Sequence, residues 1–134
     1  MTLKPLMLIP TLGLVCLLSA CAGPVPKADP SEAWIGLGQG STDDLLAERL
    51  DGKRVDDGRY FEVAPGKHDL EVLLVQGANG NTEQPECTGR VEYDQFKAGK
   101  RYHLLESGGG ADVGVSLVND HGATVAESKK FSCI

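Results

Sequence analysis

The sequence is poor in aromatic residues, in cysteine and in long apolar runs, and each shortage excludes a class of protein. Aromatic side chains make up only 5% of the 134 residues, and the four cysteines are too few for a disulfide-dense mini-protein. Basic residues are outnumbered by acidic ones, 13 to 19, which argues against a general nucleic-acid-binding protein. The apolar (41%) and charged (24%) fractions exclude collagen and wholesale disorder and fit one small globular domain.

The longest apolar run lies near the N-terminus, from Leu6 to Leu18, and its 13 residues are too few for a membrane span. A spanning helix needs roughly 20 apolar residues. Lys4 precedes the run as the only charge, and the small residues Ser19 and Ala20 follow it. This order is typical of a secretory signal peptide, which we assign to residues 1–20.

The signal segment ends in Leu18-Ser19-Ala20-Cys21, which resembles the lipobox of bacterial lipoproteins. The resemblance implies that Cys21 is linked to diacylglycerol and becomes the acylated first residue, and two or more acyl chains hold a protein on a membrane. Because Ala22 rather than Asp follows, the resemblance also implies sorting to the outer membrane, facing the periplasm. The alternative is an ordinary cleaved signal with an unmodified Cys21.

The residues after Cys21 differ in composition from the rest of the chain. Without Lys4 the mature chain has 12 basic and 19 acidic residues, a net charge of −7. Residues 22–32 contain three prolines and almost nothing to bury, which is typical of an extended tether. We therefore expect a lipidated cysteine and flexible tether over residues 21–32 and a folded domain over residues 33–134.

Apolar residues after position 50 alternate with a period of two, as in strands, and no stretch sustains a helical period. From Cys87 to Tyr93 the odd-numbered residues share one face, and the run from His68 to Val75 becomes apolar on both faces, which predicts a central strand. Further strands are expected at residues 33–38, 60–63, 101–106, 113–117 and 131–134. About seven strands without helical crossovers predict an all-β fold, an antiparallel sandwich or a small barrel.

Two turns connect these strands in the prediction. The segment 64–67 (APGK) has Pro second and Gly third, which suits a type II turn that joins residues 60–63 to the strand from His68 in a hairpin. The segment 119–122 (NDHG) is typical of a turn after the strand at 113–117.

The segment 42–50 allows two structures. Ser41 or Thr42 suits the cap of a short helix, whereas Asp51-Gly52 directly afterwards suits a tight hairpin turn. Pairing across that turn places Arg49 opposite Arg54, which is unfavourable. We favour a strand.

The turn Asp51-Gly52-Lys53 and the segment 61–72 (FEVAPGKHDLEV) resemble the PEGA-type and related small β-sandwich repeats of bacterial surface proteins. Residues 96–102 (FKAGKRY) resemble an element of uncharacterised envelope lipoproteins. These resemblances cover about 30 residues, mostly turns, and imply an Ig-like or PEGA-like sandwich in the cell envelope. They imply no activity.

Only Cys87 and Cys133 remain as cysteines of the predicted folded domain. Because the periplasm is oxidising, we expect them to form a disulfide, and the close Cys-x-x-Cys spacing of a redox pair is absent. The bridge would close a loop of 47 residues, which the chain-entropy model credits with about 4 kcal/mol of stability.

No catalytic residue, metal site or cofactor is expected from the sequence. The histidines His68, His103 and His121 lie far apart and lack metal-ligand spacing, and Ser107 lacks the setting of a nucleophile elbow. The acidic residues Asp43, Asp44, Asp56 and Asp57 lack EF-hand spacing, and the glycine-rich segments lack the Gly-Lys-Ser or Gly-Lys-Thr of a phosphate loop.

Recognition is expected first in two polar, glycine-rich loops, residues 76–86 and 107–112, because binding residues concentrate in long loops on a rigid scaffold. The candidate binding residues in these loops are Asn79, Asn81, Thr82, Glu83, Ser107 and Asp112.

The leading functional hypothesis is a non-catalytic binding or structural module of the cell envelope, held on the outer membrane through Cys21. Its expected partner is a protein or the cell wall, not nucleic acid. The alternative is a lipid-anchored inhibitor of a basic periplasmic or host enzyme such as lysozyme, since an acidic domain is steered toward a basic one.

Overall fold

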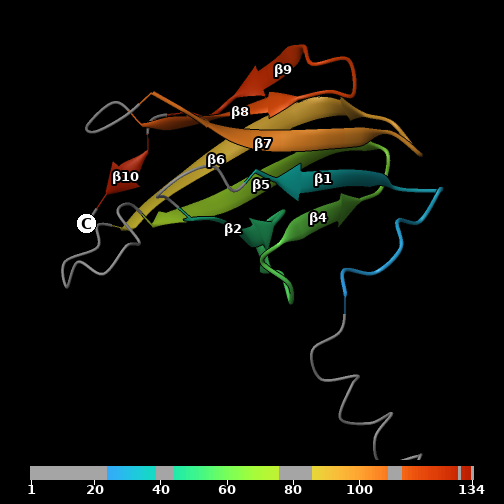
Figure 1. The fold of residues 1–134 in the computed structure, drawn as a ribbon, viewed down its shortest axis with the longest axis horizontal. Coiled ribbons are helices and arrows are strands. Elements are labelled where there is room, and N and C mark those ends of the chain that lie inside the picture. Colours follow the sequence, from blue (N-terminus) through green and yellow to red (C-terminus); the bar gives the residue numbers. More distant parts are fainter. Residues whose placement is uncertain (1–23, 39–43, 76–85, 109–112, 130, 134) are drawn as a thin grey trace, which may run out of the picture.

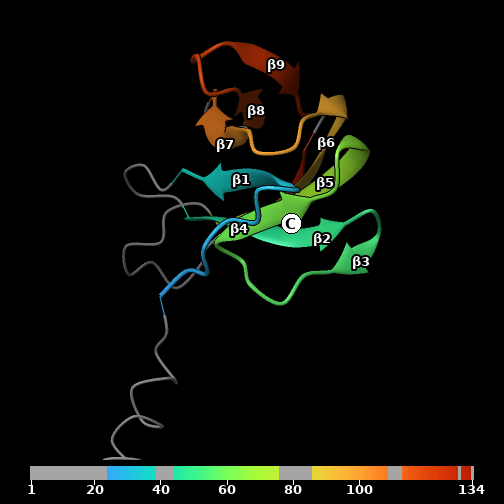
Figure 2. The same ribbon diagram turned by 90° about the vertical axis from the view of Figure 1, so that its right-hand side faces the viewer.

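The computed structural model describes residues 24–38, 44–75, 86–108, 113–129 and 131–133 of the chain. The described residues form ten strands and no helix. Two five-stranded sheets face each other as a β-sandwich (Figures 1 and 2), so the predicted all-β sandwich is confirmed. The count exceeds the expected seven partly because β3 has only two residues and the TVAE sequence of β9 does not alternate between apolar and polar residues.

Sheet A has one parallel pair of strands. Its order is β4 (Tyr60–Val63), β1 (Ala33–Leu37), β7 (Arg101–Ser107), β8 (Gly114–Val118) and β9 (Thr124–Glu127). Strand β1 runs parallel to β7, with Trp34 opposite Arg101 and Leu37 opposite Leu104, whereas the other neighbours are antiparallel. The sandwich is thus antiparallel as predicted except at this pair, where β1 and β7 both enter sheet A from the same end (Figure 1).

Sheet B is antiparallel throughout. Its order is β10 (Ser132–Cys133), β6 (Glu86–Phe96), β5 (Gly66–Val75), β2 (Asp44–Leu50) and β3 (Lys53–Arg54). Strand β5 is central, as its run of apolar residues predicts, and the ambiguous segment 42–50 is a strand from Asp44 onward.

The unfavourable pairing in the β2–β3 hairpin does occur, with Arg49 directly opposite Arg54. Each arginine has an acidic partner: Arg49 Nε lies 3.9 Å from Glu71 Oε1, and Arg54 Nη2 lies 3.3 Å from Glu48 Oε1. These partly exposed carboxylates offset the repulsion between the two guanidinium groups, and because the arginines are exposed to water the net contribution of each pair is small.

One apolar layer between the sheets forms the core. Both sheets contribute to it through every second residue of their strands, and none of the described polar or charged residues is buried. Its fully buried members include Ile35, Phe61, Leu70, Leu104 and Leu117. Burial of each such side chain contributes roughly 1.5–3 kcal/mol relative to exposure, so this layer is the main source of stability.

The turn at residues 64–67 does not close the predicted hairpin. Gly66 has the positive φ of 116° that favours glycine, but β4 pairs with β1 in sheet A while β5 joins sheet B. Strand β5 already has β2 and β6 on its two edges, which leaves no position for β4 beside it. The turn is therefore a crossing between the sheets.

A disulfide and an aromatic side chain close one end of the sandwich. Cys87 and Cys133 are directly opposite each other on β6 and β10 and are bonded, which confirms the predicted bridge. Phe131, only 8% exposed, packs over Gly89 at a distance that leaves no room for a side chain there. The bridge and the ring hold the last described residues against sheet B.

The chain enters the sandwich at the opposite end. The Asp29 N–H donates to Glu62 Oε2 at 3.1 Å, and the Gly99 N–H donates to the Glu32 carbonyl at 2.9 Å. Residues 24–29 contain no strand, and residues 29–32 are attached to sheet A by these bonds. The part of the segment 21–32 that would be free to act as a tether therefore ends at about Asp29.

Replacing Gly89 with Ala is expected to destabilise the domain by about 1–3 kcal/mol, the usual cost of overpacking. A Cβ at this position would lie 2.0 Å from Phe131 Cε1, so the ring would have to leave its site. Chemical denaturation of the two proteins measures the difference in free energy of unfolding.

The matched control is Gly58→Ala, because a Cβ there has its nearest neighbour at 3.5 Å. In a Phe131→Ala background the cost of Gly89→Ala should largely disappear, since the two positions share one contact. An equal cost in both backgrounds would contradict the packing that we describe.

Candidate functional site

The structure places only some of the residues predicted to form sites. Cys87 and Cys133 are bonded, and Ser107 is an exposed residue at the end of β7, opposite Gly114. Cys21 lies outside the described residues. So do four candidates of the first loop and one of the second, which are Asn79, Asn81, Thr82, Glu83 and Asp112. Their roles stay predictions.

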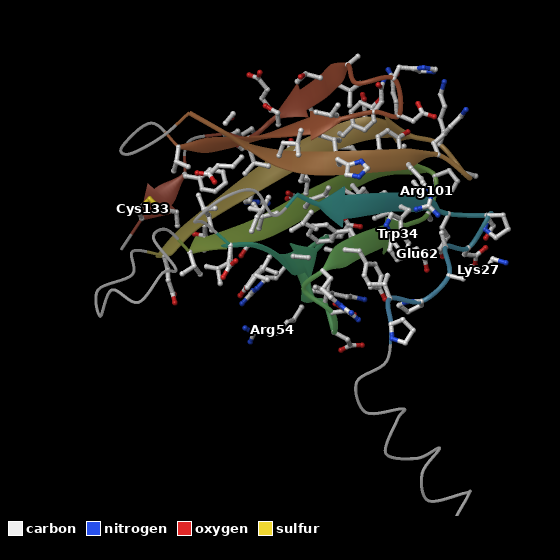
Figure 3. The ribbon with its side chains drawn as sticks, viewed as in Figure 1. Lys27, Trp34, Arg54, Glu62, Arg101 and Cys133 are labelled. Atoms are coloured by element: carbon white, nitrogen blue, oxygen red, sulfur yellow. A yellow bond between two sulfur atoms is a disulfide. The ribbon has the colours of Figure 1, made fainter. Side chains whose placement is uncertain are left out.

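The strand ends that flank the two predicted binding loops lie at the same end of the sandwich (Figure 1). Glu86, expected as the last residue of the first loop, begins β6 and pairs with Val75, and Ser107, expected as the first residue of the second loop, ends β7 and pairs with Gly114. Cys133 is labelled at this end in Figure 3, whereas Trp34, Glu62 and Arg101 lie near the end at which the chain enters. The predicted loops therefore start from the end remote from the chain entry.

The outer face of sheet A, which points away from the core, bears an apolar and aromatic strip that the sequence reading missed. We call this surface the outer strip and define it as Trp34, Tyr60, His103 and Leu105. Each has at least one buried neighbour along its strand, so by the alternation of a strand these four side chains point outward. Leu105 is 43% exposed, one of two large aliphatic residues so exposed in the described part of the chain.

Stacking and glycine residues make the outer strip continuous across three strands. The Trp34 and Tyr60 rings stack with centroids 4.2 Å apart and planes 11° from parallel. On β1, Gly36 lies between Tyr60 of β4 and His103 of β7 in the register of the sheet. Because glycine has no side chain, the His103 ring lies beside this position, 3.6 Å from where a Cβ would be.

Trp34 lies between an acidic and a basic residue at the end of the outer strip nearest the chain entry. Glu62 and Arg101 are the register partners of Trp34 on β4 and β7, and Figure 3 shows the three together. The Arg101 guanidinium carbon is 6.0 Å from the centroid of the Trp34 ring, a cation–π contact at the outer limit of useful distance. The strip therefore ends in a polar rim that could orient a partner.

The turn that leads into β4 sets the position of Tyr60. The Asp57 carboxylate accepts hydrogen bonds from the backbone N–H of Arg59 at 2.9 Å and from its Nη2 at 2.6 Å. These hydrogen bonds, from the Arg59 side chain first and its backbone second, lower the pKa of the Asp57 carboxyl from its ordinary 3.8 to about 2. The turn is held in one conformation immediately before Tyr60.

The three histidines occupy separate environments. His68 has an oxygen within hydrogen-bond distance of each ring nitrogen: Asp51 Oδ2 lies 2.6 Å from Nδ1, and the Ala64 carbonyl oxygen lies 2.7 Å from Nε2. His121 lies exposed in the turn after β8, and His103 lies exposed on the outer strip. His68 therefore braces the crossing at residues 64–67, and only His103 belongs to the candidate surface.

The pattern that indicates the outer strip is present in the sequence but is incomplete there. Once Tyr102 and Leu104 are assigned to the core, alternation directs Arg101, His103 and Leu105 outward. A single outward leucine is ordinary on a protein surface, and it becomes informative only as part of a contiguous apolar patch. Alternation does not predict that Trp34 lies between Tyr60 of β4 and the outward residues of β7. That placement depends on the long-range pairing of β1 with both strands.

Comparisons with protein-family models, with curated proteins and with solved structures find no match to this chain. Among the described residues, no group of three or more histidine, cysteine or acidic side chains is arranged to hold a metal ion. The same residues include no helix long and apolar enough to cross a membrane.

Replacing Arg59 with Gln is expected to raise the pKa of Asp57 from about 2 toward its ordinary value of 3.8, since it removes the guanidinium hydrogen bonds, the largest cause of the lowered pKa, and keeps the backbone one. Because the pKa of Asp57 is lower in the folded than in the unfolded protein, its ionised form stabilises the fold fully above about pH 4. This stabilisation is lost as the pH falls toward 2. Carboxyl carbon chemical shifts recorded against pH measure this pKa directly.

Arg54→Gln serves as the control, because Arg54 engages Glu48 instead. If Asp57 still titrated near 2 in the Arg59 variant, the cause that we assign to the lowered pKa would be wrong.

Proposed function

We propose that this chain is a lipoprotein of the bacterial outer membrane, anchored through Cys21 and facing the periplasm, whose sandwich binds an envelope partner without catalysis. The observation that carries the binding role is the outer strip, an aromatic and apolar surface on a sheet face that the core does not use. The partner is a protein or the cell wall.

The composition of the outer strip supports a binding role. Tyrosine, tryptophan and arginine are enriched in protein interfaces and dominate binding hot spots. Here Trp34 and Tyr60 are half-buried by stacking on each other, so they lose little conformational freedom when a partner arrives. Arg101 and Glu62 supply polar groups at the rim, as interfaces usually have.

The position of the chain entry supports anchoring close to a membrane. Seven residues lie between Cys21 and Asp29, where the chain is first hydrogen-bonded to the sandwich, so the two positions are at most about 28 Å apart. A lipid on Cys21 would therefore keep the sandwich close to the membrane surface. The lipobox-like tetrapeptide and the PEGA-like turns are consistent with this location.

The environments of the polar residues favour binding over catalysis. Both ring nitrogens of His68 are taken up by hydrogen bonds that brace a crossing between the sheets. His121 lies in the turn after β8, Ser107 is the last residue of β7, and His103 lies on an open sheet face rather than in a cleft. Among the described residues, no hydroxyl or thiol is hydrogen-bonded to a histidine as a nucleophile would be to its base.

Changing Cys21 to Ala is expected to abolish the incorporation of a fatty-acid analogue into the protein, because the thiol that carries the lipid is removed. Metabolic labelling followed by immunoprecipitation measures this incorporation, and Cys16→Ala is the matched control within the signal segment. Label that persists in the Cys21 variant would refute the lipobox assignment.

Changing Leu105 to Ser is expected to reduce the capture of the envelope partner by about tenfold, the loss that follows when one buried leucine contact is removed. Val25→Ser is the control, because Val25 is 42% exposed, Leu105 is 43% exposed, and Val25 lies outside the strip. Pull-down from envelope extract and co-sedimentation with purified cell-wall sacculi measure capture by protein and by glycan.

The single tryptophan gives a second readout, since Trp34 lies within the outer strip. A bound partner should change its fluorescence in the wild-type and Val25 proteins at the concentrations at which capture occurs. Equal capture by the wild-type and Leu105 proteins would contradict the proposal. Inhibition of a basic muramidase that weakens with rising salt would favour the inhibitor alternative instead.

A further inference from the structure

Strand β6 is the longest strand described, with 11 residues, and its outer edge is only partly covered. Strand β10 pairs with Cys87 and Thr88 alone, and the Lys129 N–H donates to the Arg90 carbonyl at 3.2 Å. Beyond Arg90, no described strand pairs with this edge of β6. An unpaired edge is a ready template for another strand.

The alternation of a strand shows which backbone groups face outward at this edge. The N–H and C=O of one residue point to the same side of a strand, and the side alternates from residue to residue. Because the Arg90 carbonyl points outward to Lys129, the N–H and C=O of Glu92, two residues later, point outward as well. Glu92 therefore presents one donor and one acceptor along the open part of the edge.

The open edge of β6 borders a groove. This groove, which we call the edge groove, has a volume of about 620 Å³ and lies between residues 92–95 of β6 and residues 125–127 of β9, the edge strand of sheet A. Val125 and Ala126 pack against the core and give the groove an apolar side. It is thus bordered by one unpaired edge from each sheet.

The charges around the edge groove are mainly acidic. Glu92, Asp94 and Glu127 contribute carboxylates, and Lys67 is the one basic residue among those that line it. At the rim, Lys129 Nζ lies 3.5 Å from Glu92 Oε1. This balance favours a ligand that carries positive charge.

We propose that the edge groove binds an extended, basic segment of a partner polypeptide, which adds to sheet B as a strand beside β6 and beyond β10. The backbone of this segment exchanges hydrogen bonds with Glu92, its basic side chains meet the carboxylates, and its apolar side chains face Val125 and Ala126. Strand addition to an exposed sheet edge is an established mode of peptide recognition.

The chain itself uses the same edge in the same way. Strand β10 is a short segment that pairs antiparallel with β6 at Thr88 and is fixed there by the disulfide of Cys133. The proposed segment would continue the line of β10 toward Phe96. This site is separate from the outer strip, which lies on β4, β1 and β7, so failure of either proposal leaves the other standing.

The probe is a fluorescein-labelled, amidated peptide of eight residues in which Lys and Val alternate. It is titrated by fluorescence anisotropy against the mature chain carrying Cys21→Ser, which keeps the protein in solution without lipid. Two control peptides test the two parts of the proposal. One has Glu in place of Lys, and one has N-methylated lysines, because in an antiparallel pair the residue opposite Glu92 shares its outward face and donates its backbone N–H to β6.

The lysine peptide is expected to bind more tightly than either control by at least about tenfold, which corresponds to the loss of one or two hydrogen bonds or ion pairs. Its binding should also slow amide hydrogen exchange at Glu92. Equal binding of the N-methylated peptide, or protection of outer-strip residues in place of Glu92, would overturn the proposal. So would the absence of binding at low salt.

Two pairs of variants locate the site on the protein. Asp94→Lys should weaken binding by about tenfold, whereas Asp56→Lys, with the same change of charge at an exposed residue outside the groove, should not. Glu92→Pro removes the outward N–H, and Glu92→Gln keeps it while removing the charge, so a further loss in the Pro variant measures the edge hydrogen bond. Equal effects of Asp94→Lys and Asp56→Lys would show attraction to the net charge alone and refute the site.

Discussion

The apolar layer between the two sheets is the constraint on which the rest of the structure depends. The chain must place every second residue of its longer strands in this one layer, and it does so by crossing between sheets rather than by extending one sheet. The crossings at residues 64–65 and 97–100 follow from this requirement. With the core buried on the inner faces, the outer faces and edges are left for recognition.

The alternation in the sequence predicts where the strands lie because burial on one face imposes it directly. The run from Cys87 to Tyr93 and the run from His68 to Val75 are the clearest examples, and both are strands with the predicted faces inward. Alternation does not predict which sheet a strand joins. The Pro-Gly turn at residues 64–67 predicts only that the chain changes direction there. The strand that pairs with β4 is β1, about 30 residues away in sequence, and no local pattern indicates that pairing.

The candidate surfaces were harder to predict than the fold for the same reason. The outer strip needs β1 to lie between β4 and β7, and the edge groove needs β10 to be shorter than the strand it covers. Neither fact is local in the sequence. The loops predicted at 76–86 and 107–112, by contrast, rest on composition alone, and only their residues 86, 107 and 108 are among the described residues.

Site-specific photocrosslinking in living cells tests most directly whether the sandwich binds its partner through the outer strip. A benzoyl-phenylalanine residue is introduced in place of Leu105, or in place of Val25 as an equally exposed reference. We expect a crosslinked adduct of the protein with its partner, seen as a species of higher mass, from position 105 and none from position 25. Adducts from position 25 alone, or from neither position while the protein is lipidated and folded, would contradict it.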